Sequence, residues 1–161
     1  MSYLTFSRGA RYTLRHCLEK GTIVTRTFAL LDDVSVDTST GILTMRGEAH
    51  DNFAPEISMR REGAQIVIAA GTGVIEVALR LRYDELRQAL HTLQPNDGLT
   101  TSRQVGTGQA YLGIGLKTDE SLVLRPVIVG DATGHLRLNF RLNATVRARF
   151  AQWIEACAEV K

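Results

Sequence analysis

Arginine is the residue type in this sequence best suited to binding chemistry. The chain has 161 residues and a net charge of +2; its 19 basic residues include only three lysines, so sixteen are arginines. Arginine carries a planar, always charged fork of N–H donors that matches phosphate oxygens and also stacks on rings. The enrichment favours an anion-binding or nucleic-acid-binding surface, with codon bias in a GC-rich genome as the alternative. Because the net charge is small, the placement of the arginines must distinguish the two.

Several arginines occupy alternate positions in segments typical of half-buried strands. In residues 74–82, the apolar Ile75, Val77, Leu79 and Leu81 alternate with Glu76, Ala78, Arg80 and Arg82. Residues 135–142 repeat the pattern, with leucines and a phenylalanine alternating with polar residues that include two arginines. A period of two places one set on the buried face of a sheet and the other set in solvent. We therefore expect these arginines on outward faces of antiparallel sheets.

These outward positions form the candidate site, predicted to bind a single strand of nucleic acid. Phosphates would meet the arginines, and bases would stack on the ring of Tyr111. Gly113 and Gly115 share the register of Tyr111 and should leave the sheet surface open. Ion pairing with Glu48 and Glu76, also outward, is the alternative and would make an ordinary solvated face. The candidate residues are Arg46, Arg60, Arg80, Arg82, Tyr111, Lys117, Arg137 and Arg141.

The sequence contains no established catalytic or metal-binding motif. The four histidines are scattered, and the Gly-x-Gly strings at 71–73 and 106–108 lack the rest of a dinucleotide-binding fingerprint. Cys17 and Cys157 lie near opposite ends without a zinc-ligand spacing, and we expect free thiols in a reducing compartment. We therefore predict a non-catalytic protein that needs no cofactor or metal.

The predicted location is cytoplasmic, without a membrane partner. No apolar run approaches the ~18–20 residues of a membrane span, and residues 1–12 lack the apolar core of a secretory signal.

The pattern of alternating and helical periods predicts an α+β fold. Amphipathic helices are expected at 83–93 and after Asn143, which is placed to cap the last helix. Ser7 and Gly21 bracket a short N-terminal helix. Strands are expected at 22–36, 42–49, 56–61, 64–70, 74–82, 109–117, 121–129 and 135–142.

The chain is predicted to be a single domain over residues 1–161, built from two similar blocks. The N-terminal helix occupies 1–21, and residues 22–95 and 96–161 each contain antiparallel strands followed by one amphipathic helix. In both blocks an alternating strand with outward arginines runs directly into the helix, as residues 77–93 and 136–154 illustrate. This internal repeat predicts a pseudo-symmetric fold.

This order of elements, from Thr22 to Ala158, resembles Whirly proteins and PUR-repeat proteins. Those families bind single-stranded DNA or RNA on antiparallel sheets and often form oligomers, so the resemblance implies a nucleic-acid partner and a homo-oligomer. A structural or protein-interaction module that self-assembles through exposed strand edges is the alternative hypothesis.

A third hypothesis comes from two short motifs. Arg11-Tyr12-Thr13-Leu14-Arg15 is similar to the RxxxR motif of PilZ domains. Asp37-Thr38-Ser39-Thr40-Gly41 is similar to their D/N-x-S-x-x-G turn, with one residue missing. The resemblance implies a receptor for cyclic di-GMP, with these residues on its phosphates and guanines.

Overall fold

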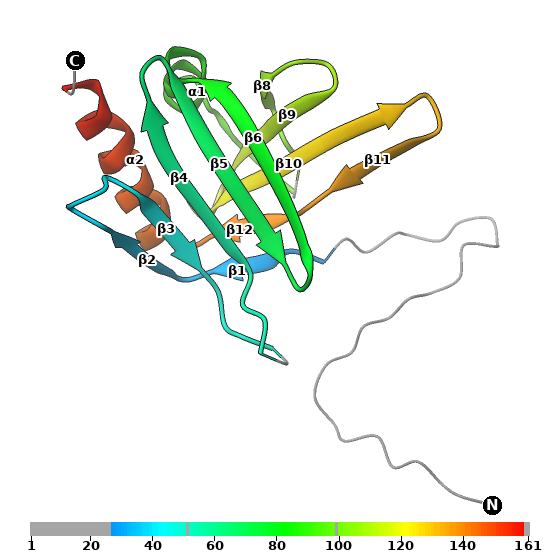
Figure 1. The fold of residues 1–161 in the computed structure, drawn as a ribbon, viewed down its shortest axis with the longest axis horizontal. Coiled ribbons are helices and arrows are strands. Elements are labelled where there is room, and N and C mark those ends of the chain that lie inside the picture. The colour runs from blue at the N-terminus through cyan, green and yellow to red at the C-terminus, as the bar shows by residue number, and fades with distance from the viewer. Residues whose placement is uncertain (1–26, 51, 99, 160–161) are drawn as a thin grey trace, which may run out of the picture.

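Two β-sheets and two helices make up the described part of the chain (Figure 1). The computed structural model describes residues 27–161 except residues 51, 99 and 160–161. The predicted N-terminal helix at 1–21 lies outside these residues. Within them the α+β class is confirmed, as one sheet of seven strands and one of five.

The five-stranded sheet is an antiparallel meander in which each strand pairs with the next along the chain. Tight turns join its last three strands, and Gly63 and Gly73 take the left-handed backbone conformation there, with φ of +59° and +61°. Glycine adopts this conformation without steric cost, which favours a short hairpin at each position. The strands are β2 (Asp33–Val36), β3 (Leu43–Arg46), β4 (Glu56–Glu62), β5 (Gln65–Thr72) and β6 (Ile75–Arg82).

The seven-stranded sheet is built around one long strand, β10 (Leu122–Asp131), which pairs with three others. Its strand order is β1-β12-β10-β9-β7, with β11 also on β10 and β8 also on β9. Most pairs are antiparallel, but β1 runs parallel to β12 and β7 runs parallel to β9. The other strands are β1 (Ala29–Leu31), β7 (Pro95–Asn96), β8 (Arg103–Gly106), β9 (Ala110–Lys117), β11 (Gly134–Arg137) and β12 (Phe140–Leu142).

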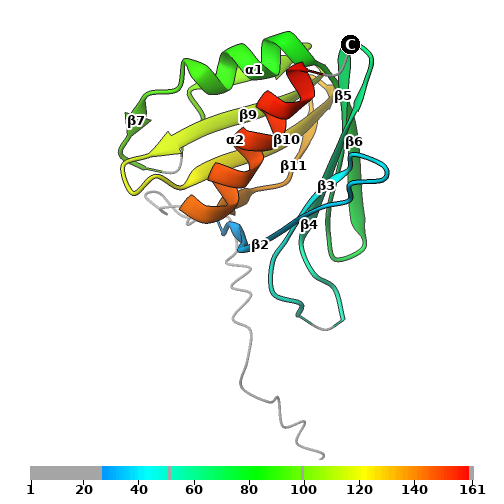
Figure 2. The same cartoon turned by 90° about the vertical axis from the view of Figure 1, so that its left-hand side faces the viewer.

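The core lies between the two sheets and the helices α1 (Tyr83–His91) and α2 (Ala144–Ala158). Figure 2 shows the helices side by side over the seven-stranded sheet, with the five-stranded sheet at their flank. Helix α2 begins where predicted, because the Asn143 side chain accepts a hydrogen bond of 2.8 Å from the backbone N–H of Val146. Its apolar side buries Phe150, Trp153 and Ile154.

The predicted pseudo-symmetry is not confirmed, because the two sheets have different strand orders. The long strand expected at 22–36 changes sheets at Asp32: β1 pairs with β12, whereas β2 pairs with β3. The first predicted block therefore supplies a strand to the sheet of the second block. The strand expected at 135–142 is also divided, since β11 pairs only with β10 whereas β12 lies between β10 and β1.

A close crossing of the chain requires glycine in the seven-stranded sheet. Gly115 is buried, and a Cβ atom there would meet the backbone carbonyl of Thr100. Gly113 is likewise buried against the side chain of Thr101. The segment that carries these threonines therefore passes directly over β9.

We expect Gly115→Ala to lower the free energy of unfolding by about 1–3 kcal/mol, because an added methyl group displaces the crossing backbone. Gly134→Ala is the matched control, since a Cβ at Gly134 meets nothing within 4 Å. Urea denaturation of both variants measures the difference. Equal stability of the two variants would contradict the crossing.

Candidate functional site

The structure divides the predicted site residues between two outward faces. Arg46, Arg60, Arg80 and Arg82 lie on the face of the five-stranded sheet opposite its buried side chains. Tyr111, Lys117, Arg137 and Arg141 lie on the corresponding face of the seven-stranded sheet. We call these the outer faces of the two sheets. The eight residues therefore form two groups, each of which has its own electrostatic surroundings.

On the outer face of the five-stranded sheet, acidic side chains accompany the arginines. Arg46 forms an ion pair of 2.6 Å with Glu56 on the neighbouring strand. Glu62 pairs with both Arg60 and Arg80, at 2.8 Å in the second case. These exposed pairs contribute little to stability. They nevertheless lower the positive charge that this face can offer a phosphate.

Arg82 is also placed beside an acid, at the junction between β6 and α1. Its guanidinium lies 3.7 Å from the Glu85 carboxylate, one helical turn further along the chain. All four predicted arginines of this sheet are thus within an ion-pair distance of a carboxylate. The alternative of a solvated, charge-paired face describes this half of the predicted site, but the partners are Glu56, Glu62 and Glu85 instead of the expected Glu48 and Glu76.

The outer face of the seven-stranded sheet has a different charge pattern. Among the described strands of this sheet, Asp131 is the only acidic residue, and its carboxylate accepts hydrogen bonds from Thr133 in the β10–β11 turn. The register places Tyr111, Val127 and Arg137 in one row across β9, β10 and β11. Val127 is buried, Tyr111 is half-buried and Arg137 is exposed.

Arg141 is the one predicted arginine of this sheet with an acidic partner. Its guanidinium binds the carboxylate of Asp119 in the β9–β10 turn and donates a 3.1 Å hydrogen bond to the Ser121 hydroxyl. The pKa of Asp119 falls to about 2, first because of hydrogen bonds from Ser121 and then because of the charges of Arg141 and Lys117. Arg141 therefore fixes a turn at the end of the face, whereas Arg137 lies further along the β10–β11 hairpin, which extends outward in Figure 1.

The structure adds Arg125, which is not among the residues predicted from the sequence. It lies in the middle of β10 on the outer face, but is only 7% exposed. The guanidinium carbon lies 5.7 Å from the centre of the Phe28 ring, and Nε donates a 2.8 Å hydrogen bond to the Asn139 side chain. The sequence could have indicated this residue, because Arg125 lies inside the apolar run 122–129, and a charged side chain in a buried strand requires polar or aromatic partners.

The expectation of an open platform beside Tyr111 is wrong. Gly113 and Gly115 are buried, because Thr100 and Thr101 cross over them. The exposed part of this outer face therefore lies toward the β10–β11 hairpin, next to the row of Tyr111 and Arg137.

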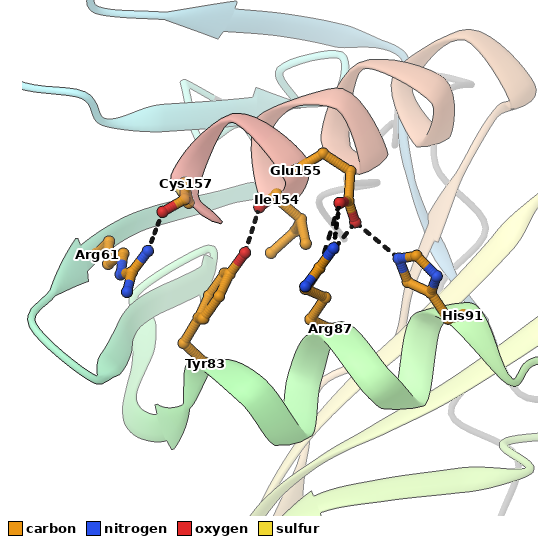
Figure 3. Close-up of polar contacts among 7 residues, drawn as sticks. All are labelled: Arg61, Tyr83, Arg87, His91, Ile154, Glu155 and Cys157. Carbon is orange, nitrogen blue, oxygen red and sulfur yellow. Dashed lines mark hydrogen bonds and ion pairs between the residues drawn. The ribbon is translucent and has the colours of Figure 1, made fainter. Parts of the chain in front are cut away.

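Away from the outer faces, a cluster of polar side chains joins α1 and α2 (Figure 3). Both oxygens of Glu155 on α2 accept hydrogen bonds from Arg87 on α1, and the closest contact is 2.8 Å. His91, one turn further along α1, lies 2.7 Å from the same carboxylate. The hydrogen bonds from Arg87 and then His91 lower the pKa of Glu155 to about 2. A carboxylate this acidic is a poor proton acceptor at neutral pH, so the cluster is suited to clamping the helices.

Tyr83 and Arg61 make further contacts with α2 near its C-terminal end. The Tyr83 hydroxyl donates a 2.8 Å hydrogen bond to the carbonyl of Ile154, and Arg61 lies over the Tyr83 ring at 4.3 Å. Arg61 also donates to the carbonyl of Cys157 (Figure 3). A cation at the last carbonyls of a helix is favoured by the helix dipole. Burial raises the pKa of the Cys157 thiol.

The turn compared with the PilZ motif is closed by its own side chains. Asp37 accepts hydrogen bonds from the backbone and hydroxyl of Ser39, at 2.8 and 2.6 Å. These bonds lower the pKa of Asp37 to about 2. The RxxxR sequence at 11–15 lies outside the described residues.

No group of three or more His, Cys, Asp or Glu side chains within the described ranges is arranged to hold a metal ion.

Comparison of the chain with protein-family models, with curated proteins and with solved structures finds no significant match. None of the helices in the described part is long and apolar enough to cross a membrane.

We expect the Glu155 clamp to contribute stability above about pH 4.5 and to lose it as the pH falls toward 2, because its pKa is lowered from 4.5 to about 2 in the folded chain. Glu155→Gln should reduce the change in melting temperature over this range. Glu159→Gln, which removes an exposed carboxylate from the end of α2, is the matched control for the loss of one negative charge. Identical profiles for both variants and the parent would show that the clamp has no such role.

Proposed function

We propose that this chain binds single-stranded nucleic acid on the outer face of its seven-stranded sheet. The observation that carries the proposal is the charge of this face. It carries Arg137 and Lys117, together with Arg141, which is paired with Asp119 of the β9–β10 turn. Asp131, at the end of β10, is the only acid within the described strands of the sheet. A phosphate backbone approaching this face meets cations with few competing carboxylates.

The exposed contact is expected at the row of Tyr111 and Arg137. The two side chains share a face and are two strands apart, which is about 9–10 Å across a sheet. A base can then stack on the Tyr111 ring while a neighbouring phosphate meets the Arg137 guanidinium. Stacking of this kind tolerates any base, so the proposal implies little sequence preference.

Arg125 supports this contact from beneath. Its guanidinium contacts the Asn139 side chain and the Phe28 ring, and these contacts restrict the side chain to one position. We assign the direct contact with phosphate to Arg137, which is exposed.

The outer face of the five-stranded sheet is less suited to this role. Arg46, Arg60 and Arg80 each pair with a glutamate there. A phosphate would have to displace a carboxylate that is already bound. The predicted residues of this sheet therefore serve as internal controls for those of the other.

A labelled oligonucleotide followed by fluorescence anisotropy tests the proposal. Affinity should fall steeply with salt, and Arg137→Ala should reduce the slope of log K against log[salt] by about one, because one phosphate contact is lost. Tyr111→Ala should weaken binding by about 1–3 kcal/mol through loss of stacking.

Arg80→Ala is the matched control, since it removes an exposed arginine from the other sheet and should leave affinity almost unchanged. The absence of binding at low salt would overturn the proposal. So would an equal loss of affinity in Arg80→Ala and Arg137→Ala.

A further inference from the structure

The outer face of the five-stranded sheet segregates its charges along the strands. One end, which we call the acidic end, is the row Asp33, Arg46, Glu56, Gly71 and Glu76. The other, the basic end, consists of Arg60, Val67 and Arg80 followed by Glu62, Gln65 and Arg82. Between them runs a central row of short side chains: Ser35, Thr44, Ser58, Ala69 and Ala78.

The two ends carry opposite net charge after their internal pairs are counted. At the acidic end three carboxylates surround one arginine, and neither Asp33 nor Glu76 forms an ion pair with a described residue. At the basic end three arginines surround one carboxylate, Glu62, although Arg82 also lies near Glu85 of α1. The face therefore has the charge distribution of a dipole aligned with the strands.

This face is open to an approaching surface. Figure 1 looks onto the five-stranded sheet, and no other described helix or strand covers it. Ser35 and Ala78 of the central row are exposed, and Thr44, Ser58 and Ala69 are partly exposed. Because these side chains are short, a second sheet can approach the centre to the ~10 Å spacing of packed sheets.

We infer that two copies of the chain associate through this face, related by a twofold axis that lies between the two faces and runs parallel to the central row. Such an axis places the acidic end of each copy over the basic end of the other, so the same surface is complementary to itself. A second copy therefore brings opposite charge to both the acidic end and the basic end. The inference does not depend on nucleic-acid binding, because the outer face of the seven-stranded sheet remains free.

The expected interface is small. One outward residue covers about 32 Å² of sheet, so the outward positions of the five strands cover about 500 Å². A standard interface buries about 800 Å² on each partner. The dimer should accordingly be reversible, with dissociation in the micromolar range or weaker, and should weaken as salt screens its charges.

Sedimentation velocity over a range of concentrations tests the dimer. Arg80→Glu and Glu76→Lys should each weaken dimerisation by about tenfold, because each substitution is present in both copies and so removes two attractive contacts between an acidic end and a basic end. An equimolar mixture of the two variants should associate more tightly than either variant alone, since the unaltered acidic end of one meets the unaltered basic end of the other.

Three further variants distinguish this arrangement from other ways of associating. Ala69→Glu places like charges near the twofold axis and should also dissociate the dimer. Arg137→Glu makes the same change of charge as Arg80→Glu on the other sheet and should leave the dimer intact. Leu136→Lys alters the exposed strand β11, which pairs only with β10, and should likewise have no effect. Melting temperatures establish that each variant is folded.

A parent chain that stays monomeric at all concentrations would overturn the inference. A dimer that survives both Arg80→Glu and Glu76→Lys would do the same. Loss of the dimer in Leu136→Lys alone would assign association to a strand edge instead of this face.

Discussion

Each sheet packs one face against the opposite sheet and the helices, and this packing directs the alternate side chains to the other face. Leu79 and Leu81 of β6 are at most 3% exposed, so Arg80 and Arg82 between them must point outward. The same constraint on β10 buries Leu122 and Leu124 in the core and turns Arg125 to the other side. The chain thus has two outer faces. That of the five-stranded sheet is open, whereas on that of the seven-stranded sheet Val123, Arg125 and Val127 are buried and the exposed part lies around Tyr111 and Arg137.

The two outer faces use their arginines differently. On the five-stranded sheet, each predicted arginine lies beside a glutamate, and net charge survives only as a separation between the two ends. On the seven-stranded sheet, Asp131 at the end of β10 is the only acid within the described strands, and Arg137 and Tyr111 flank a buried valine. We therefore assign nucleic-acid binding to one face and self-association to the other, so that a dimer would present two binding faces on opposite sides.

Local features of the fold could be predicted from the sequence because they depend on neighbouring residues. The hairpins at Gly63 and Gly73 and the Asn143 cap follow from turn and capping chemistry. The allocation of strands to sheets could not, because it depends on contacts distant in sequence: Ala29 pairs with Phe140, and Asp32 lies where the chain changes sheets. The failure of the predicted symmetry has the same origin.

The candidate site shows the same division. Alternation identified the outward arginines, but not their partners, since the pairing of Arg80 with Glu62 depends on the register between β4, β5 and β6. The crossing of Thr101 over Gly113 and the burial of Arg125 beside Phe28 also arise from tertiary contacts.

We propose that nucleic acid binds to the outer face of the seven-stranded sheet and not to that of the five-stranded sheet. A backbone NMR titration with a short single-stranded oligonucleotide distinguishes the two faces. We expect amide shifts to change in β9, β10 and β11 around Tyr111, Val127 and Arg137, and to remain unchanged along β4, β5 and β6. Shifts concentrated around Arg60 and Arg80, or no shifts at any oligonucleotide concentration, would contradict the proposal.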